Sequence, residues 1–182
     1  MSARRHIGFF AAALTFPLIV CAHRLDEYLQ ATRLSLASDQ IVLKIDLTPG
    51  VDTAAVIFAS IDSDRDGRIS DDEAGAYANL VLDEIVLDVD GKHRPVFLAS
   101  EEFPSFQDMS AGIGIIRIEA RAPWAGLPGR HSVYFRNDHR PELGVYLVNA
   151  LVPESPDIEI VGQHRDTLQR EFRLIFELDP HR

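Results

Sequence analysis

The chain has 182 residues, of which 46% are hydrophobic and 25% are charged, as expected of one globular domain with its own core. The formal net charge is −10; this acidic balance argues against nucleic acid and anionic membrane surfaces as partners and is compatible with cation binding. The single cysteine, Cys21, lies in the N-terminal segment described next, which excludes disulfides and thiolate chemistry from the rest of the chain.

The N-terminus has the organisation of a secretory signal peptide. Arg4 and Arg5 supply a basic start, and the apolar run IGFFAAALTFPLIV follows. Val20 and Ala22 occupy the −3 and −1 positions of a cleavage site, so we expect residues 1–22 to be removed and His23 to begin the mature chain. The apolar run is short for a membrane span, and we expect no transmembrane segment in the mature chain.

Two alternatives remain open for this segment. The residues LIVC are similar to a lipoprotein box, in which Cys21 would become the lipidated first residue. The apolar run could also be retained as an N-terminal anchor. In each case the domain is exported, and we expect it in the periplasm or outside the cell.

Alternation of apolar and polar residues dominates the mature chain and predicts about nine strands. Between them lie turn sequences such as SDQ, PWAGLPG, DHRPELG and PESPD. The segment from Ile85 to Ala99 is predicted to form a hairpin around Asp90-Gly91, a favoured tight turn. The other expected strands are Tyr28–Ala37, Gln40–Thr48, Gly112–Ala122, Arg130–Asn137, Gly144–Val152, Asp157–Arg165 and Leu168–Leu178.

Helical periodicity occurs in one region, at Val51–Ile61 and at Asp72–Glu84. The short, regular spacing of the strands favours an antiparallel arrangement over a parallel α/β sheet. The predicted fold is therefore mainly β: an antiparallel, immunoglobulin-like β-sandwich over residues 23–182, with a helix–loop–helix inserted at 50–84. The segment from Glu101 to Gly112 is expected to be an irregular connection.

The loop between the two helices, DSDRDGRISDDE, carries the spacing of a calcium-binding loop. Its position 6 is Gly67, where a sharp turn is needed, and its position 8 is the apolar Ile69. Calcium takes six to eight oxygen ligands. The expected ligands are the side chains of Asp62, Asp64, Asp66, Ser70 and Glu73 and the backbone carbonyl of Arg68.

The sequences that flank the loop support the same motif. Ala54, Ile57, Phe58 and Ile61 precede it, and Ala74, Tyr77, Ala78 and Val81 follow it. Each set repeats at three- and four-residue steps and would form one face of a helix. Over Val51 to Leu82 the chain resembles the EF-hand family. The resemblance implies a helix–loop–helix that binds Ca²⁺.

A single such loop in an exported protein favours a structural ion over a signalling ion, because sensor hands work against a partner hand. A second metal hypothesis concerns His23. An N-terminal histidine offers an α-amine and an imidazole to copper or nickel, and His93, His131, His139 or His164 could add ligands. The alternative is that His23 is an ordinary polar residue at a chain end.

No catalytic signature occurs in the sequence, so we expect a binding or accessory module and not an enzyme. The stretches AHRLDEYLQATRLSL, LTPGVDTAAVIFASIDSDRDG and VYLVNALVPESPDIEI resemble the extracytoplasmic N-terminal region of bacterial hydrogenase/urease-accessory nickel permeases. This resemblance implies an accessory domain that handles nickel or copper for a permease, as an alternative to the calcium-stabilised binding module. The expected partners are a calcium ion and an envelope or membrane protein.

Overall fold

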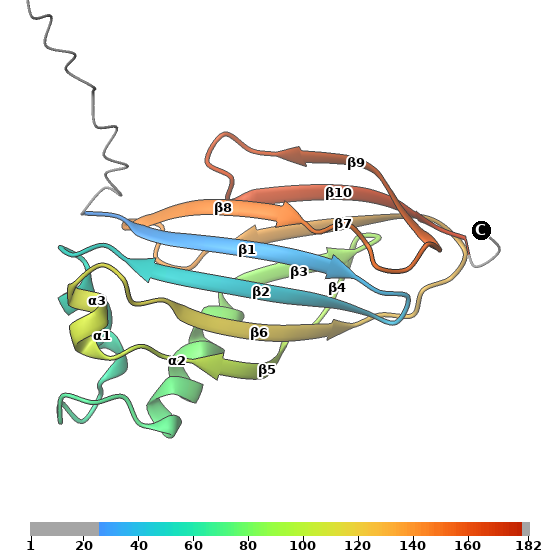
Figure 1. Cartoon of the computed structure of the whole chain (residues 1–182). Helices are drawn as coiled ribbons and strands as arrows, with labels where there is room; N and C mark the ends of the chain where they lie inside the picture. The colour runs from blue at the N-terminus through green and yellow to red at the C-terminus, as the bar shows by residue number, and fades with distance from the viewer. Residues whose placement is uncertain (1–25, 180–182) are drawn as a thin grey trace, which may run out of the picture.

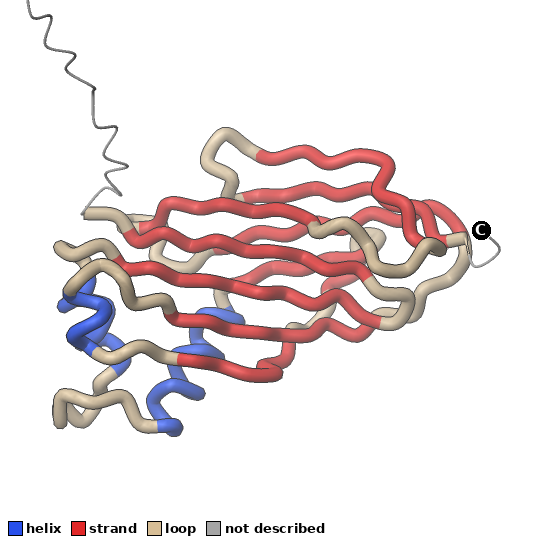
Figure 2. The backbone as a smooth tube through the Cα atoms, viewed as in Figure 1, coloured by secondary structure: helices blue, strands red, loops and turns tan. Residues whose placement is uncertain are grey.

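The computed structural model describes residues 26–179, so the predicted signal peptide, Cys21 and His23 lie outside the described part. The described chain is mainly β and forms two five-stranded sheets and three helices (Figures 1 and 2). None of these helices has the length and apolar composition needed to cross a membrane.

Strand order defines the two sheets. The first sheet runs β5-β6-β2-β1-β8 and the second runs β4-β3-β7-β10-β9. The first sheet contains β1 (Tyr28–Leu36), β2 (Gln40–Pro49), β5 (Phe97–Glu102), β6 (Ile116–Pro123) and β8 (Gly144–Ala150). The second contains β3 (Ile85–Val89), β4 (Lys92–His93), β7 (Gly129–Asn137), β9 (Ile158–Arg165) and β10 (Glu171–Leu178).

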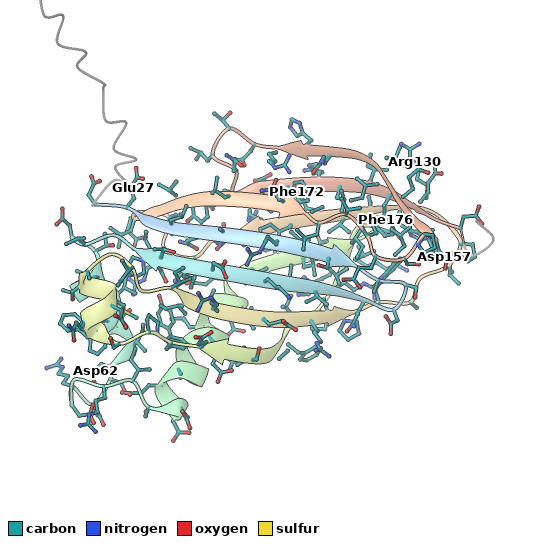
Figure 3. All side chains as sticks on the ribbon, viewed as in Figure 1. Glu27, Asp62, Arg130, Asp157, Phe172 and Phe176 are labelled. Atoms are coloured by element: carbon teal, nitrogen blue, oxygen red, sulfur yellow. The ribbon has the colours of Figure 1, made fainter. Side chains whose placement is uncertain are left out.

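Alternating burial explains why the two sheets lie face to face. In β2, Leu43 and Ile45 are fully buried while their neighbours face outwards, and in β10 Phe172 and Phe176 do the same. These side chains belong to one continuous core shared by both sheets; Figure 3 labels the two phenylalanines. Removal of these side chains from water supplies the main driving force for the layered fold.

The predicted purely antiparallel arrangement is wrong at one edge of the first sheet. Strand β8 pairs with β1 in the parallel direction, with Tyr28 opposite Gly144 and Leu34 opposite Ala150. The chain leaves the first sheet after β6, adds β7 to the second sheet, and then returns to the free side of β1. Period-two alternation reports which face of a strand is buried, but it does not report which strand lies alongside.

The predicted hairpin is only partly correct. Asp90 (φ 53°) and Gly91 (φ 71°) form the expected tight turn between β3 and β4, since both central residues of such a turn need positive φ. However, β4 has only two residues, and β5 pairs with β6 of the other sheet. Pro95 lies between β4 and β5 and has no N–H with which to continue a ladder.

The helices α1 (Ala54–Ile61) and α2 (Asp71–Asp83) lie between β2 and β3, as predicted, and bury the predicted apolar faces. The expectation of helix in one region only is wrong, because α3 (Phe106–Ser110) occupies the segment expected to be irregular. Ser105 caps α3 by accepting from the Asp108 amide at 3.2 Å. Met109 is fully buried, and the Phe106 ring packs on Phe58 of α1 at 4.6 Å between centroids.

Candidate metal centre

The acidic loop joins the end of α1 to the start of α2, at the end of the molecule where Figure 3 labels Asp62. The carboxylates of Asp62, Asp64 and Asp66 each place one oxygen within 4.8 Å of the other two. Asp62 is 6% exposed, whereas Asp64 and Asp66 face solvent. The structure therefore brings together the predicted ligands at positions 1, 3 and 5 of the loop.

Backbone amides hold these carboxylates in place despite their mutual repulsion. Asp62 accepts from the amides of Asp66 at 3.1 Å and Gly67 at 3.0 Å, through its two oxygens. Asp64 also accepts from the Asp66 amide, at 3.0 Å, and Asp66 accepts from the Arg68 amide at 2.8 Å. Such charge-assisted bonds fix the direction of each side chain.

The loop backbone follows a tight path that needs left-handed residues. Arg65 has φ 63° and Gly67 has φ 83°. A Cβ at position 67 would meet no atom within 4 Å, so the constraint on Gly67 comes from its backbone conformation and not from space. This agrees with the glycine predicted at position 6 of the loop.

Glu73, the predicted ligand at position 12, connects the two ends of the loop. Its Oε1 accepts from the backbone amide of Ser63 at 2.7 Å and that of Asp64 at 3.3 Å. Its Oε2 accepts from the Ser70 amide at 3.0 Å and the Ser70 hydroxyl at 2.9 Å. The hydrogen bonds from Ser70 are the main cause that lowers the pKa of Glu73 to about 2, so the carboxylate is ionised at neutral pH.

Ser70 and Glu73 together form a capping box at the start of α2. The Ser70 hydroxyl also accepts from the Glu73 amide at 3.4 Å, which satisfies one of the free donors of the first helical turn. Glu73 is not among the three carboxylates that converge. Of the six predicted ligands, the structure thus groups three, uses two in the helix cap, and places the Arg68 amide against Asp66.

The donor set is suited to a hard divalent cation. Three carboxylates and the nearby Glu73 offer oxygen ligands and negative charge, which Ca²⁺ and Mg²⁺ prefer. Within residues 26–179, the side chains grouped closely enough to share a metal ion are all aspartates, and soft or imidazole-preferring metals are poorly served by such a set.

Within residues 26–179, none of the four histidines suggested as further ligands of a copper or nickel site belongs to a group of three side chains close enough to share a metal ion. His139 is fully buried and contacts Tyr77 and Glu84. His131 contacts Asp90 and the carbonyl of Leu127, and His93 lies 3.5 Å from Asp88. His23 lies outside the described residues, so its part in this hypothesis stays a prediction.

A buried polar network, which the sequence analysis did not anticipate, surrounds His139. The Nδ1 atom of His139 lies 2.5 Å from Glu84 Oε2, and its Nε2 lies 3.1 Å from the Tyr77 hydroxyl. The Tyr77 hydroxyl also contacts the Tyr28 hydroxyl at 3.1 Å. Burial lowers the pKa of His139 despite the neighbouring Glu84. The ring is therefore neutral, with Nδ1–H donating to Glu84 and Nε2 accepting from Tyr77.

Backbone groups complete this network. The carbonyl of His139 accepts from the Gln30 side chain at 2.8 Å and from the Tyr146 hydroxyl at 2.7 Å. Asn137 donates to Gln30 at 2.9 Å and accepts from the His139 amide at 2.9 Å. Tyr77 lies in α2, Gln30 in β1 and Asn137 in β7, so the network ties the second helix of the acidic loop to both sheets.

One signal in the sequence pointed towards this network. Gln30 shares the alternation phase of Tyr28 and Leu34 in β1, which places it on the buried face of the strand. A polar side chain in a buried phase needs a hydrogen-bonding partner. The identity of that partner, 109 residues away in the chain, depends on the tertiary fold.

Comparison with protein-family models, with curated proteins and with solved structures finds no match to this chain.

Proposed function

We propose that the chain is an exported binding module in which the loop from Asp62 to Glu73 binds one Ca²⁺ ion, and that this ion stabilises the fold. The observation that carries the proposal is the convergence of the Asp62, Asp64 and Asp66 carboxylate oxygens to within 4.8 Å of one another. Three like charges at this distance repel each other, and a divalent cation between them would remove that cost.

The loop chemistry favours calcium over other metals. Asp62, Asp64 and Asp66 would supply carboxylate oxygens, and Glu73 lies close enough to accept from the Asp64 amide at 3.3 Å. The backbone carbonyl of Arg68 and the Ser70 hydroxyl are the remaining expected ligands. The EF-hand resemblance over Val51 to Leu82 agrees with this set. A bound ion would supply positive charge to a set of oxygen ligands.

The packing of the helices supports a structural role for the ion. The residues that flank the loop already belong to buried faces: Ile61 is 2% exposed and Ala74 is 8% exposed. Further along, Ile57 in α1 and Ala78 in α2 are fully buried. A sensor hand would expose an apolar groove on binding its ion, whereas these helices would have to leave the core to do so.

The proposal also includes an immunoglobulin-like sandwich with an inserted EF-hand, and export of the protein from the cytoplasm. The two face-to-face sheets support an immunoglobulin-like sandwich with an inserted EF-hand. The N-terminal segment supports export, with His23 as the first mature residue. Mass spectrometry of the exported protein tests this point: a first residue other than His23 would contradict the cleavage site, and a lipidated Cys21 would support the lipoprotein alternative.

Thermal unfolding with and without calcium tests the structural role. At calcium concentrations about 100-fold above the dissociation constant, binding contributes about 2.7 kcal/mol, which corresponds to a rise in Tm of roughly 5 to 10 °C for a domain of this size. Asp62→Asn should reduce this rise. The matched control is Asp71→Asn, which changes an exposed acid in the same segment at a non-ligand position. An unchanged Tm in wild-type protein with calcium and with chelator would overturn the structural role.

A further inference from the structure

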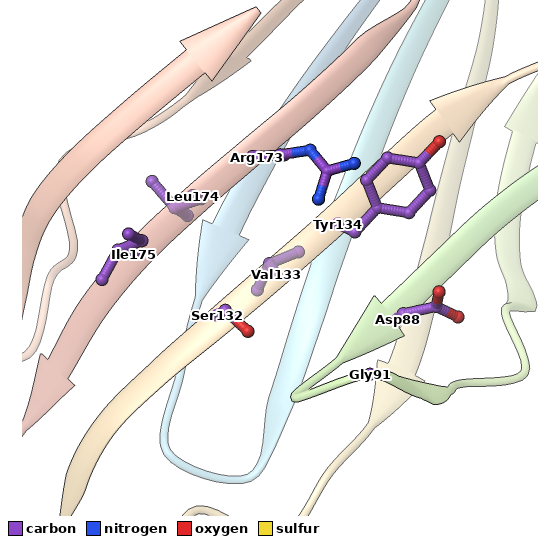
Figure 4. Close-up of a pocket in the computed structure, with 8 residues that line it drawn as sticks. All are labelled: Asp88, Gly91, Ser132, Val133, Tyr134, Arg173, Leu174 and Ile175. Carbon is purple, nitrogen blue, oxygen red and sulfur yellow. The ribbon is translucent and has the colours of Figure 1, made fainter.

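The outer face of the second sheet carries a pocket that is distinct from the acidic loop. Its volume is about 520 Å³, which falls in the size range of small-molecule sites. The pocket lies across β3, β7 and β10 (Figure 4). Its lining includes Asp88, Ser132, Tyr134, Arg173 and Ile175.

Strand register arranges charged and aromatic groups in one row across this face. Asp88 lies opposite Tyr134 in the β3–β7 pair, and Tyr134 lies opposite Arg173 in the β7–β10 pair. Figure 4 shows the Tyr134 ring between the other two side chains. Since neighbouring strands are about 4.8 Å apart, the acidic and basic ends of the row are separated by about 10 Å at the backbone.

A serine and a glycine leave the hollow beside this row. Ser132 and Ile175 face each other in the next row along the sheet. Gly91, in the turn after β3, also lines the pocket and contributes no side chain. The floor of the pocket therefore combines the hydroxyl group of Ser132 with the aliphatic side chain of Ile175. The stacked Tyr134 and Arg173 side chains lie beside it.

The guanidinium of Arg173 is positioned by an aromatic ring. Its guanidinium lies over the Tyr134 ring at 4.8 Å from the ring centroid, a cation–π contact that restricts the side chain. Among the residues from 26 to 179 it has no hydrogen-bond or ion-pair partner. A stacked guanidinium with its N–H groups unused is well suited to bidentate recognition of a carboxylate.

On the opposite side of the pocket, protein groups can accept hydrogen bonds from a ligand. Within residues 26–179, the one side-chain contact of the Asp88 carboxylate is with the exposed His93 ring at 3.5 Å, so it retains capacity to accept. The Ser132 hydroxyl can donate or accept and has a long contact of 3.5 Å with Asp90. A ligand that fits this pattern carries a carboxylate at one end and hydroxyl groups at the other, around an apolar C–H face that can lie against Ile175.

From this arrangement we infer that the outer face of the second sheet binds a small polyhydroxylated carboxylate, of the size of an acidic monosaccharide. Arg173 binds the carboxylate, Asp88 and Ser132 bind hydroxyl groups, and Tyr134 holds Arg173 in place. The inference is independent of the calcium proposal, because none of these residues belongs to the acidic loop.

Titration of the ¹⁵N-labelled full chain with D-glucuronate, monitored by NMR, tests the inference. We expect saturable shifts of the amides around Ser132–Tyr134 and Arg173–Ile175, at concentrations of up to about 50 mM for such an open site. Glucose lacks the carboxylate and acetate lacks the hydroxyl groups, so each should bind at least about tenfold more weakly. Absence of saturable shifts with glucuronate, or equal binding of glucose or acetate, would overturn the ligand class.

Two variants separate the pocket from general charge effects. Arg173→Gln should weaken glucuronate binding at least about tenfold, because the charged partner of the carboxylate is lost. Arg121→Gln is the matched control: Arg121 is an exposed arginine of the first sheet, paired with Glu119 at 3.5 Å, and its loss should leave the affinity unchanged. Equal affinity of wild type and Arg173→Gln would refute the site, whatever the outcome of calcium binding.

Discussion

The imidazole of His131 donates from Nδ1 to Asp90 Oδ2 at 2.7 Å and from Nε2 to the carbonyl of Leu127 at 2.6 Å. Both partners can only accept, and a neutral imidazole has a single N–H. The two bonds together therefore require the imidazolium form. His131 thus connects the turn after β3 to the segment that leads from β6 into β7, as an ion pair with Asp90.

This geometry predicts a pH-dependent stability. Partial burial lowers the pKa of His131, but the bonds to Asp90 and Leu127 outweigh it and raise the pKa above 6.5. Since the folded state binds the proton more tightly, the contribution of His131 is fully present below its ordinary pKa and is lost as the pH rises through the raised value. Urea unfolding between about pH 5.5 and 8.5 measures it.

The difference between wild type and His131→Gln isolates this effect from other titrating groups. The stability advantage of wild type should shrink as the pH rises over that interval. The control is His164→Gln, which changes an exposed histidine of β9; the change with pH should be larger for His131→Gln than for this control. An advantage of wild type over His131→Gln that stays constant with pH would show that the imidazolium pair does not form.

Removal of one hydroxyl group from the network around His139 should lower the free energy of unfolding. Tyr77→Phe removes the hydroxyl that lies 3.1 Å from both His139 Nε2 and the Tyr28 hydroxyl. Buried partners left without a hydrogen bond cost about 1 to 3 kcal/mol, measured as a loss in the free energy of unfolding by urea. Tyr134→Phe, on the outer face of the second sheet, is the control and should cost less than about 0.5 kcal/mol. Equal losses of stability in Tyr77→Phe and Tyr134→Phe would show that the network does not stabilise the fold.

Two glycines near the acidic loop should respond in opposite directions to alanine. Gly75 lies inside α2, and a Cβ there would meet only Glu101 Oε1 at 3.8 Å, so Gly75→Ala should stabilise the protein by about 1 kcal/mol through helix propensity. Gly67 has φ 83°, and Gly67→Ala should destabilise it by roughly 1 kcal/mol. Urea unfolding of the two variants decides; stabilisation by Gly67→Ala would contradict the left-handed conformation of the loop.

Local chemistry explains which parts of the fold could be predicted. Alternation predicted Gln40–Thr48 and Leu168–Leu178 as strands, which correspond to β2 and β10. Three- and four-residue steps placed Ile57 and Tyr77 on the buried faces of their helices. These patterns depend on residues near in sequence. The parallel pairing of β8 with β1 and the transfer of β5 to the first sheet depend on competition between distant strands, and no local pattern encodes that competition.

The candidate sites also differ in whether their residues are close together in the sequence. The acidic loop could be predicted because its ligands lie within twelve consecutive residues and its turn needs a glycine at position 67. The buried partners of His139 come from α2 and from strands of both sheets, and the row from Asp88 to Arg173 comes from three strands. Helix packing and strand register bring those residues together, and neither was available from the sequence.

Titration of the full chain with Ca²⁺ by isothermal calorimetry tests whether the acidic loop is a calcium site. We expect one ion per wild-type chain. We also expect loss of this binding in the double variant Asp62→Ala and Asp64→Ala, which removes two of the three carboxylates that converge in the loop, and retention in Asp71→Asn. Absence of binding to wild type, or unchanged binding in the double variant, would contradict the assignment of the loop as a calcium site.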